Sequence, residues 1–154
     1  MLNLAIVLGV FLIMEAVTWF THKYIMHGFL WVLHKDHHDH RLHNSWWEKN
    51  DAFFIIFATP SIILFALGTL YAVPYCWQIG LGITCYGMAY FLVHDIFIHQ
   101  RIKVFRDSES SYFRGLRRGH KMHHKHIGKG EGECFGMLMV PFKYFKREME
   151  AKKA

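Results

Sequence analysis

Long uncharged stretches alternate with histidine-rich polar segments along this chain. Leu2 to Phe20 contains one charged residue, Glu15, whereas Ala52 to Tyr71 and Val73 to Val93 contain none. Each stretch has about 20 residues, enough for a helix to cross a hydrocarbon core of roughly 30 Å. The pattern predicts an all-α integral membrane bundle with three spans, in which the histidine-bearing segments are helical extensions or a fourth helical region.

Two shorter segments complete the predicted architecture. The apolar segment from Phe135 to Phe142 is too short to cross a bilayer and is expected either at the interface or as a re-entrant segment. The Lys- and Glu-rich end from Lys143 onward is expected to form a solvated amphipathic helix. We expect the whole chain, residues 1–154, to form one domain.

Composition agrees with a membrane protein, because 53% of the residues are hydrophobic and 17% are aromatic. The first stretch lacks a basic leader and a small-residue cleavage site, so we interpret it as a span and not as a secretory signal. No Arg- and Ser-rich transit segment precedes it, which favours a bacterial inner membrane. Cys76, Cys85 and Cys134 have no spacing typical of a disulfide framework or a zinc ribbon.

The basic residues predict the orientation of the spans. All 18 Lys and Arg residues lie either between Lys23 and Lys49 or from Arg101 to the end of the chain. The turn from Tyr71 to Pro74 has none. Cytoplasmic loops are enriched in Lys and Arg, so the beginning of the chain is expected outside and the polar segments in the cytoplasm. All the histidine clusters are then expected on the cytoplasmic side.

Ten histidines stand in four clusters, and the two halves of the chain use the same order of spacings. The pairs, with the pattern His-x4-His, are His22 with His27 and His94 with His99; the triplets, with the pattern His-x-x-His-His, are His34, His37 and His38, followed by His120, His123 and His124. Neutral imidazole is a common metal ligand, and one metal rarely takes more than three or four protein ligands. The clusters therefore predict two metals held close together.

Helical geometry distinguishes the two kinds of cluster. Positions i, i+3 and i+4 of an α-helix fall within about 100° of arc, so each triplet is expected to converge on one metal. Five residues turn an α-helix by roughly 140°, so each pair is expected to straddle a face. The members of a pair would then flank a centre between helices or serve different metals.

Other polar residues near the clusters are candidates for a supporting role. Asp36 and Asp95 stand beside ligands and are expected either to accept the second N–H of an imidazole or to contact solvent. Glu15 lies within a span, where an unpaired ionisable group is costly, so we expect a partner for it at the metal centre or a protonated carboxyl near the interface. His40, His43 and His126 fit no cluster spacing and are expected at the surface.

Three other classes of membrane protein fit the pattern less well. A membrane haem protein needs facing histidine pairs within its spans, and the spans contain no histidine before His94. A transporter places ionisable ligands near the midplane of the bilayer, where only Glu15 comes close. A metalloprotease of the His-Glu-x-x-His type is excluded because that motif is absent.

Three segments resemble those of bacterial β-carotene 3-hydroxylases, which belong to the fatty-acid hydroxylase/sterol desaturase superfamily. They run from His22 to His38 (HKYIMHGFLWVLHKDHH), from Phe91 to Arg101 (FLVHDIFIHQR) and from Gly119 to His124 (GHKMHH), the last followed by Phe135-Gly136. The resemblance covers the chain from about Glu15 to Pro141.

This resemblance implies that the ten histidines hold two irons that activate O2. The implied reaction hydroxylates carbon 3 of each β-ionone ring and converts β-carotene through β-cryptoxanthin to zeaxanthin. Spacing alone does not select iron, because an all-nitrogen site also suits copper and zinc. A fatty-acid or sterol hydroxylase, or a carotenoid ketolase, remains the alternative because these enzymes share the metal core.

Hydroxylation by O2 requires two electrons, and the chain has no flavin or dinucleotide motif and no cysteine set for an iron–sulfur cluster. We therefore expect an external donor of the ferredoxin type. Ferredoxins are typically acidic, and five basic residues around the last histidine cluster are candidates for docking one: Arg114, Arg117, Arg118, Lys121 and Lys125. The same charges are equally suited to anionic lipid headgroups.

Overall fold

The computed structural model describes residues 1–42, 45–105, 107–130 and 132–151, and over these ranges it is helical and has no strand. The predicted all-α fold class is confirmed. In chain order the elements are α1 (Leu2–Phe20), η1 (Thr21–Phe29), α2 (Trp31–His38), η2 (His40–Leu42), η3 (Lys49–Asp51), α3 (Ala52–Leu70), α4 (Cys76–Phe91), η4 (Leu92–Ile98), α5 (Ser111–His124) and α6 (Phe142–Ala151). The segments η1 and η4 are π-helical, and η2 and η3 are 3₁₀ turns.

Three continuous helical runs are long and apolar enough to cross a membrane: Leu2–Phe29, Lys49–Leu70 and Cys76–Ile98. Most side chains of the first two runs face outward, as expected for helices surrounded by lipid. The prediction of three spans is confirmed. The first and third runs are longer than predicted, because η1 continues α1 and η4 continues α4 directly into the histidine-bearing segments.

The third span begins at Cys76, three residues later than the predicted start at Val73. Ala72 and Tyr75 both have left-handed backbone conformations, with φ of 52° and 64°. Pro74 lies between them and has no N–H to continue a helical ladder. The connection between α3 and α4 is therefore a tight turn that ends one span sharply and starts the next.

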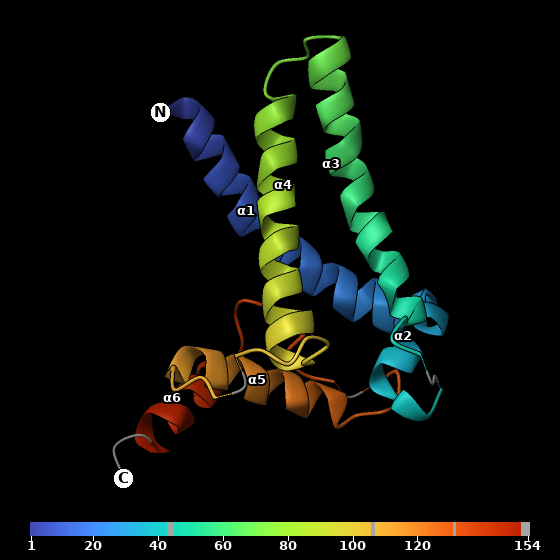
Figure 1. Cartoon of the computed structure of the whole chain (residues 1–154), viewed down its shortest axis with the longest axis vertical. Coiled ribbons are helices and arrows are strands. Elements are labelled where there is room, and N and C mark those ends of the chain that lie inside the picture. Colours follow the sequence, from blue (N-terminus) through green and yellow to red (C-terminus); the bar gives the residue numbers. More distant parts are fainter. Residues whose placement is uncertain (43–44, 106, 131, 152–154) are drawn as a thin grey trace.

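Helix α4 packs against α1 on one side and against α3 on the other (Figure 1). Two of its glycines allow this close packing. A Cβ on Gly82 would lie 2.8 Å from the Val7 carbonyl oxygen of α1, and one on Gly80 would lie 3.3 Å from the Ser61 carbonyl oxygen of α3. Residues two apart point to opposite sides of a helix, so this Gly-x-Gly sequence brings α4 against both neighbours.

Helices α5 and α6 lie across the end of the spans that carries the histidines (Figure 1). They are joined by Glu148 of α6, which is buried and forms ion pairs with Arg114 and Arg118 of α5. A small apolar core, which includes Phe97, Leu116 and Met137, connects α5 to η4 and to the 135–140 segment. The two helices therefore close the polar end of the bundle.

The orientation predicted from the basic residues can be tested by cysteine labelling in intact cells. We expect a membrane-impermeant maleimide to reach Ala72→Cys, at the exposed α3–α4 turn, from outside the cell. Lys129→Cys, in an exposed loop beside the histidines, should react only after the membrane is opened. The parent chain, with Cys76 and Cys134 buried and Cys85 half-buried, gives the background signal. Labelling of Ala72→Cys from the cytoplasmic side alone would reverse the orientation.

Candidate metal centre

Both His-x4-His pairs stand on π-helical backbone. His22 and His27 lie in η1; His94 lies in η4, and His99 is the residue that caps its end. A π-helix bonds each N–H to the carbonyl five residues earlier, as the His99 N–H does to the His94 carbonyl at 2.9 Å. Residues five apart therefore lie about one turn apart and on the same face. The ring centroids are 5.2 Å apart in the first pair and 4.5 Å apart in the second.

The imidazoles form two adjoining groups at the end of the bundle. We call the first the five-histidine group: His22, His27, His34, His38 and His123. The second is the four-histidine group: His37, His94, His99 and His120. Within each group the candidate ligand nitrogens all lie within 4.8 Å of one another. Each group therefore offers enough nitrogen donors for one metal ion.

This division differs from the expectation that each triplet converges on one metal, and it agrees with the alternative in which the two members of a pair flank one centre. The members of each pair stay together in one group, because the π-helical turn superimposes them. The triplets are divided instead: His34 and His38 of α2 face one group while His37 faces the other, and α5 divides His120 from His123 in the same way. Helices α2 and α5 therefore both contribute to the two groups, which brings the groups side by side.

His124 lies where the two groups meet. Its ring stacks on that of His38 with centroids 4.4 Å apart, and it lies 4.5 Å from the ring of His120 in the other group. Its Nε2 atom is buried and has no hydrogen-bond partner among the described residues. The structure thus gathers all ten predicted histidines into one cluster and leaves a buried nitrogen donor at its centre.

An acceptor stands behind most of the imidazoles. The Nδ1 atoms of seven histidines lie 2.7 to 3.2 Å from a carbonyl, amide or carboxylate oxygen, and these histidines are His22, His27, His34, His37, His38, His94 and His123. Because these oxygens accept hydrogen bonds, each neutral ring carries its proton on Nδ1. Its lone pair then lies on Nε2, which faces the interior of the cluster.

The facing Nε2 atoms fit a metal ion. The distance is 3.0 Å from His22 to His34, 3.0 Å from His37 to His94 and 2.8 Å from His99 to His120. Two nitrogens that bind one metal at about 2.1 Å and at right angles lie about 3.0 Å apart. Lone pairs at this spacing repel each other unless a cation lies between them. The donor set therefore fits metal coordination, in which the ligands are neutral imidazoles.

The protonation states agree with this interpretation. Burial lowers the pKa of His38 to about 4. Burial, together with the neighbouring imidazoles, lowers the pKa of His34, His37 and His120 well below the ordinary value. These four rings are therefore neutral near pH 7, as metal ligands must be.

Two supporting residues were missed by sequence reasoning. Asn50 accepts a hydrogen bond from His34 Nδ1 at 2.7 Å, and Glu48 accepts one from His37 Nδ1 at the same distance. Both are buried and stand where α3 begins, and Glu48 also forms a capping box with Asp51 there. In the sequence, these two residues are recognisable only as a carboxylate and an amide at the polar edge of an apolar span. Helix capping is an equally good explanation for polar residues at that position.

The two aspartates named from the sequence occupy different positions. Asp95 accepts from His94 Nδ1 at 3.0 Å and is therefore placed behind a candidate ligand. Asp36 instead accepts from the backbone N–H of Lys49 at 2.7 Å and joins α2 to η3. His126 contributes its backbone carbonyl, which accepts from His38 Nδ1. His43 and the side chain of His40 lie outside the described residues.

Comparison with known proteins agrees with this site. A family model described as fatty acid hydroxylase matches residues 7–145. The chain belongs to this family. A beta-carotene hydroxylase of Paracoccus sp. (strain PC1) is 39% identical over 142 residues, covering 92% of this chain and 86% of that protein. A beta-carotene hydroxylase of Pantoea ananas is 41% identical over 128 residues, covering 83% of this chain and 71% of that protein.

A plant relative matches the same region. The chloroplastic beta-carotene 3-hydroxylase of Gentiana lutea is 37% identical over 131 residues, which is 83% of this chain but 40% of that protein. No solved structure matches the chain. The resemblance drawn from the histidine segments is confirmed, and the chain is a fatty acid hydroxylase family member with histidine clusters that suit a metal centre.

Glu15 contacts the segment that follows the last histidines. Its carboxylate accepts from three consecutive backbone N–H groups, those of Met137, Leu138 and Met139, and from the Tyr86 hydroxyl at 2.6 Å. Gly136 permits this approach, because a Cβ there would lie 2.7 Å from Glu15 Oε1. Within the part of the chain that the structure describes, the hydrogen bonds of Glu15 join it to this turn and to Tyr86, and none joins it to a histidine.

That turn contacts the five-histidine group. The carbonyl of Phe135 accepts from His22 Nδ1 at 2.9 Å, and the carbonyl of Glu133 accepts from His123 Nδ1 at 2.9 Å. Glu15 therefore fixes, through the backbone, two acceptors that orient imidazoles of the five-histidine group. The sequence indicated that Glu15 supports the site but not that it acts through the backbone of this turn. Backbone N–H groups are present in nearly every residue, so residue types do not reveal these three donors.

The candidate docking residues divide into two sets. Arg114 and Arg118 bind Glu148, and Arg117 donates to the backbone carbonyls of Phe97 and Phe105. These three guanidinium groups have structural contacts. Lys121 and Lys125 are exposed on and just beyond the end of α5, beside the histidines. They are the candidates best placed to meet a partner.

The division of the triplets can be tested by measuring metal content. We expect His34→Ala and His37→Ala each to lower the metal-to-protein ratio by about half, since each removes a ligand from a different group. Turnover should be lost in both variants while the protein remains in the membrane. His126→Ala, which keeps the backbone carbonyl, is the matched control and should retain metal and activity. Full metal content in both ligand variants would refute the assignment.

The role of Glu15 can be tested with two substitutions. Glu15→Gln keeps one oxygen acceptor, so partial activity should survive. Glu15→Leu removes both acceptor oxygens and should lower activity or metal affinity by about 10- to 100-fold, which is typical when a group that supports a metal ligand is removed. The leucine variant should also become more sensitive to proteolysis near residues 137–139. Activity equal to that of an exposed control, Glu109→Leu, would show that the turn does not need Glu15.

Proposed function

We propose that the protein is a β-carotene 3-hydroxylase, which hydroxylates carbon 3 of the β-ionone rings and forms zeaxanthin through β-cryptoxanthin. The matches to bacterial relatives named beta-carotene hydroxylase cover most of this chain and most of each relative. The ten histidines of this chain lie together at one end of an apolar bundle. The single observation that carries the proposal is the buried cluster of inward-facing imidazole lone pairs beside an apolar cavity.

The cavity lies between α1, α3 and α4 and has a volume of about 550 Å³. Most of its wall is apolar or aromatic, from Phe65 within the span to Met26 and Asn50 at the histidine end. Asn50 also holds His34, so the cavity reaches residues that contact the five-histidine group. A cavity of this size and lining suits one end of an elongated hydrocarbon.

The polar groups in the cavity wall satisfy one another. The Ser61 hydroxyl donates to Thr84 Oγ1 at 2.8 Å, because the Thr84 hydroxyl itself donates to the Gly80 carbonyl. Hydroxyls that are already paired bind water weakly, so the wall favours a ring without polar groups. The helices thus exclude water and direct a ring from the bilayer toward the polar end of the spans.

We propose iron as the metal, with one ion in each histidine group. Two irons held by these ligands would activate O2, which inserts one oxygen atom into a C–H bond and releases the other as water, using two electrons and two protons. The buried imidazoles of this chain supply neutral ligands, and the acceptors behind them fix the orientation of each ring. The apolar cavity positions the ring carbon.

We further propose that the polar end faces the cytoplasm of a bacterial inner membrane, as the basic residues predict. A reduced ferredoxin-type protein would dock there and deliver the electrons. Lys121 and Lys125 are the exposed charges nearest the histidines on α5, and complementary charge mainly accelerates encounter.

The product distinguishes this function from its alternatives. Expression in cells that accumulate β-carotene, followed by chromatography of the pigments, should give β-cryptoxanthin and zeaxanthin. The His37→Ala variant, expressed at the same level, should leave β-carotene unchanged. A ring ketone would assign a ketolase instead. Unchanged β-carotene with hydroxylated fatty acids or sterols would assign the activity to those substrates.

The docking surface can be tested by charge reversal. The double variant Lys121→Glu/Lys125→Glu should slow ferredoxin-driven turnover several-fold at low salt, and its rate should depend less on salt than that of the parent. The matched control is Lys146→Glu/Arg147→Glu, which makes the same change of charge on exposed residues of α6. Equal rates for the two double variants would exclude a specific donor surface at the end of α5.

A further inference from the structure

The two histidine groups differ in the chemistry of the acceptors behind them. Every acceptor behind the five-histidine group is neutral: the carbonyls of Lys129, Phe135, His126 and Glu133, and the amide oxygen of Asn50. In the four-histidine group, His37 donates to the carboxylate of Glu48 and His94 donates to that of Asp95. A carboxylate acceptor makes an imidazole a stronger donor to a metal than a carbonyl does.

Arg101 connects these two carboxylates. Its guanidinium lies 3.3 Å from Glu48 Oε2 and 3.2 Å from Asp95 Oδ1, and a third carboxylate, that of Asp51, lies 2.7 Å from it. The side chains of Arg101 and Glu48 are 9% and 8% exposed, and that of Asp95 is 1% exposed. Buried carboxylates without a cation are strongly unfavourable, so the guanidinium holds both of them in place.

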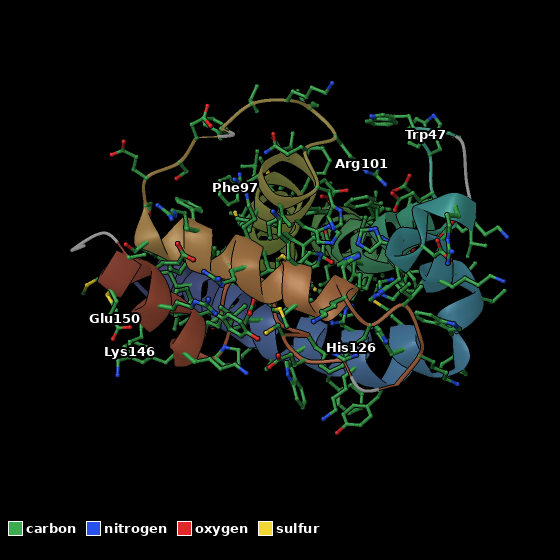
Figure 2. The ribbon with its side chains drawn as sticks, turned by 90° about the horizontal axis from the view of Figure 1, so that it is seen from below. Trp47, Phe97, Arg101, His126, Lys146 and Glu150 are labelled. Atoms are coloured by element: carbon green, nitrogen blue, oxygen red, sulfur yellow. The ribbon has the colours of Figure 1, made fainter. Side chains whose placement is uncertain are left out.

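The backbone around Arg101 is also held in place. Gln100 has a left-handed conformation with φ of 57°, and its side-chain amide donates to the carbonyls of Ile96, Phe97 and Val104. The N–H of Arg101 donates to the Asp95 carbonyl at 3.0 Å. Arg101 therefore turns back against the end of η4, where Figure 2 shows it beside the segment that carries Trp47.

We propose that Arg101 is a positioning residue for the four-histidine group. By fixing Glu48 against His37 and Asp95 against His94, it sets the orientation and donor strength of two facing ligands and raises the metal affinity of this group alone. Among the described residues, no ion pair joins Arg101 to an acceptor of the five-histidine group, because four of those acceptors are backbone carbonyls of other segments and the fifth is the neutral side-chain amide of Asn50. The inference rests on the metal centre of the proposed function but not on the carotenoid substrate.

An alternative effect of Arg101 has the opposite sign. A guanidinium is also a positive charge near a cation site, and by charge alone its removal would strengthen metal binding. Arg101 reaches Glu48 through Nη2 and Asp95 through Nε, and the single ammonium nitrogen of a lysine cannot occupy both positions. The direction of the change in affinity therefore separates positioning from simple charge.

The test is a chelator titration of the metal-loaded, purified enzyme, in which the metals remaining per chain are counted. For Arg101→Gln we expect one of the two metals to leave at a chelator concentration about 10- to 100-fold lower than in the parent, while the other is unchanged. Arg101→Lys, which keeps the charge and guards against loss of folding, should remain weakened. Arg114→Gln, which breaks the peripheral pair with Glu148, is the matched control and should match the parent.

A complementary variant identifies the group affected. Asn50→Leu removes the neutral acceptor behind His34 and should weaken the other metal, so that the double variant with Arg101→Gln loses both. The proposal would be overturned if Arg101→Gln weakened both metals in parallel, or if it left metal binding unchanged or tighter. It would also be overturned if Arg101→Lys fully recovered the metal affinity of the parent. A parent enzyme without bound metal would refute the metal centre itself, whereas a parent with two metals and no carotenoid product would refute only the substrate.

Discussion

Ten imidazoles are gathered at one end of this bundle, and most of them are buried so that their Nε2 lone pairs face one another. Neutral lone pairs about 3 Å apart repel, so this arrangement needs both a cation between the rings and a fixed tautomer in each ring. The acceptors behind Nδ1 fix the tautomer in seven of the rings. Much of the surrounding structure places those acceptors.

The fold can be understood from this requirement. The first two apolar spans contribute little buried core of their own, and their outward side chains are suited to lipid. Their continuations η1 and η4 carry the histidine pairs, while the start of α3 supplies Glu48 and Asn50. The turn at 137–139 is bound to the first span through Glu15 and brings the carbonyl of Phe135 to His22. The spans therefore supply and position the residues of the site, and the two parts cannot be separated.

Much of this arrangement was predictable from the sequence. Hydrophobic length predicted the spans, and the repeated spacings predicted one centre built from both halves of the chain. An α-helical interpretation of the spacings gives the wrong division of the triplets and leaves the grouping of the pairs open. The two histidines of each His-x4-His pair are five residues apart, which is the hydrogen-bond spacing of a π-helix. On that backbone the same spacing predicts that the two rings lie together.

The acceptors behind the rings were harder to predict, for physical reasons. Four of the five neutral acceptors of the five-histidine group are backbone carbonyls, which every residue has, so no residue type marks them. Glu48 and Asn50 stand at a helix start, where polar residues are common. Arg101 was visible only as one charge among many, because its three carboxylate partners come from two separate segments.

The central claim is that facing imidazoles hold two neighbouring metal ions. X-ray absorption spectroscopy of the iron-loaded, purified protein tests it most directly. Two irons in these groups should give only nitrogen and oxygen neighbours in the first coordination shell, strong multiple scattering from imidazole rings, and a second iron as a more distant scatterer. Sulfur in the first shell, or an isolated iron with few imidazole neighbours, would contradict it.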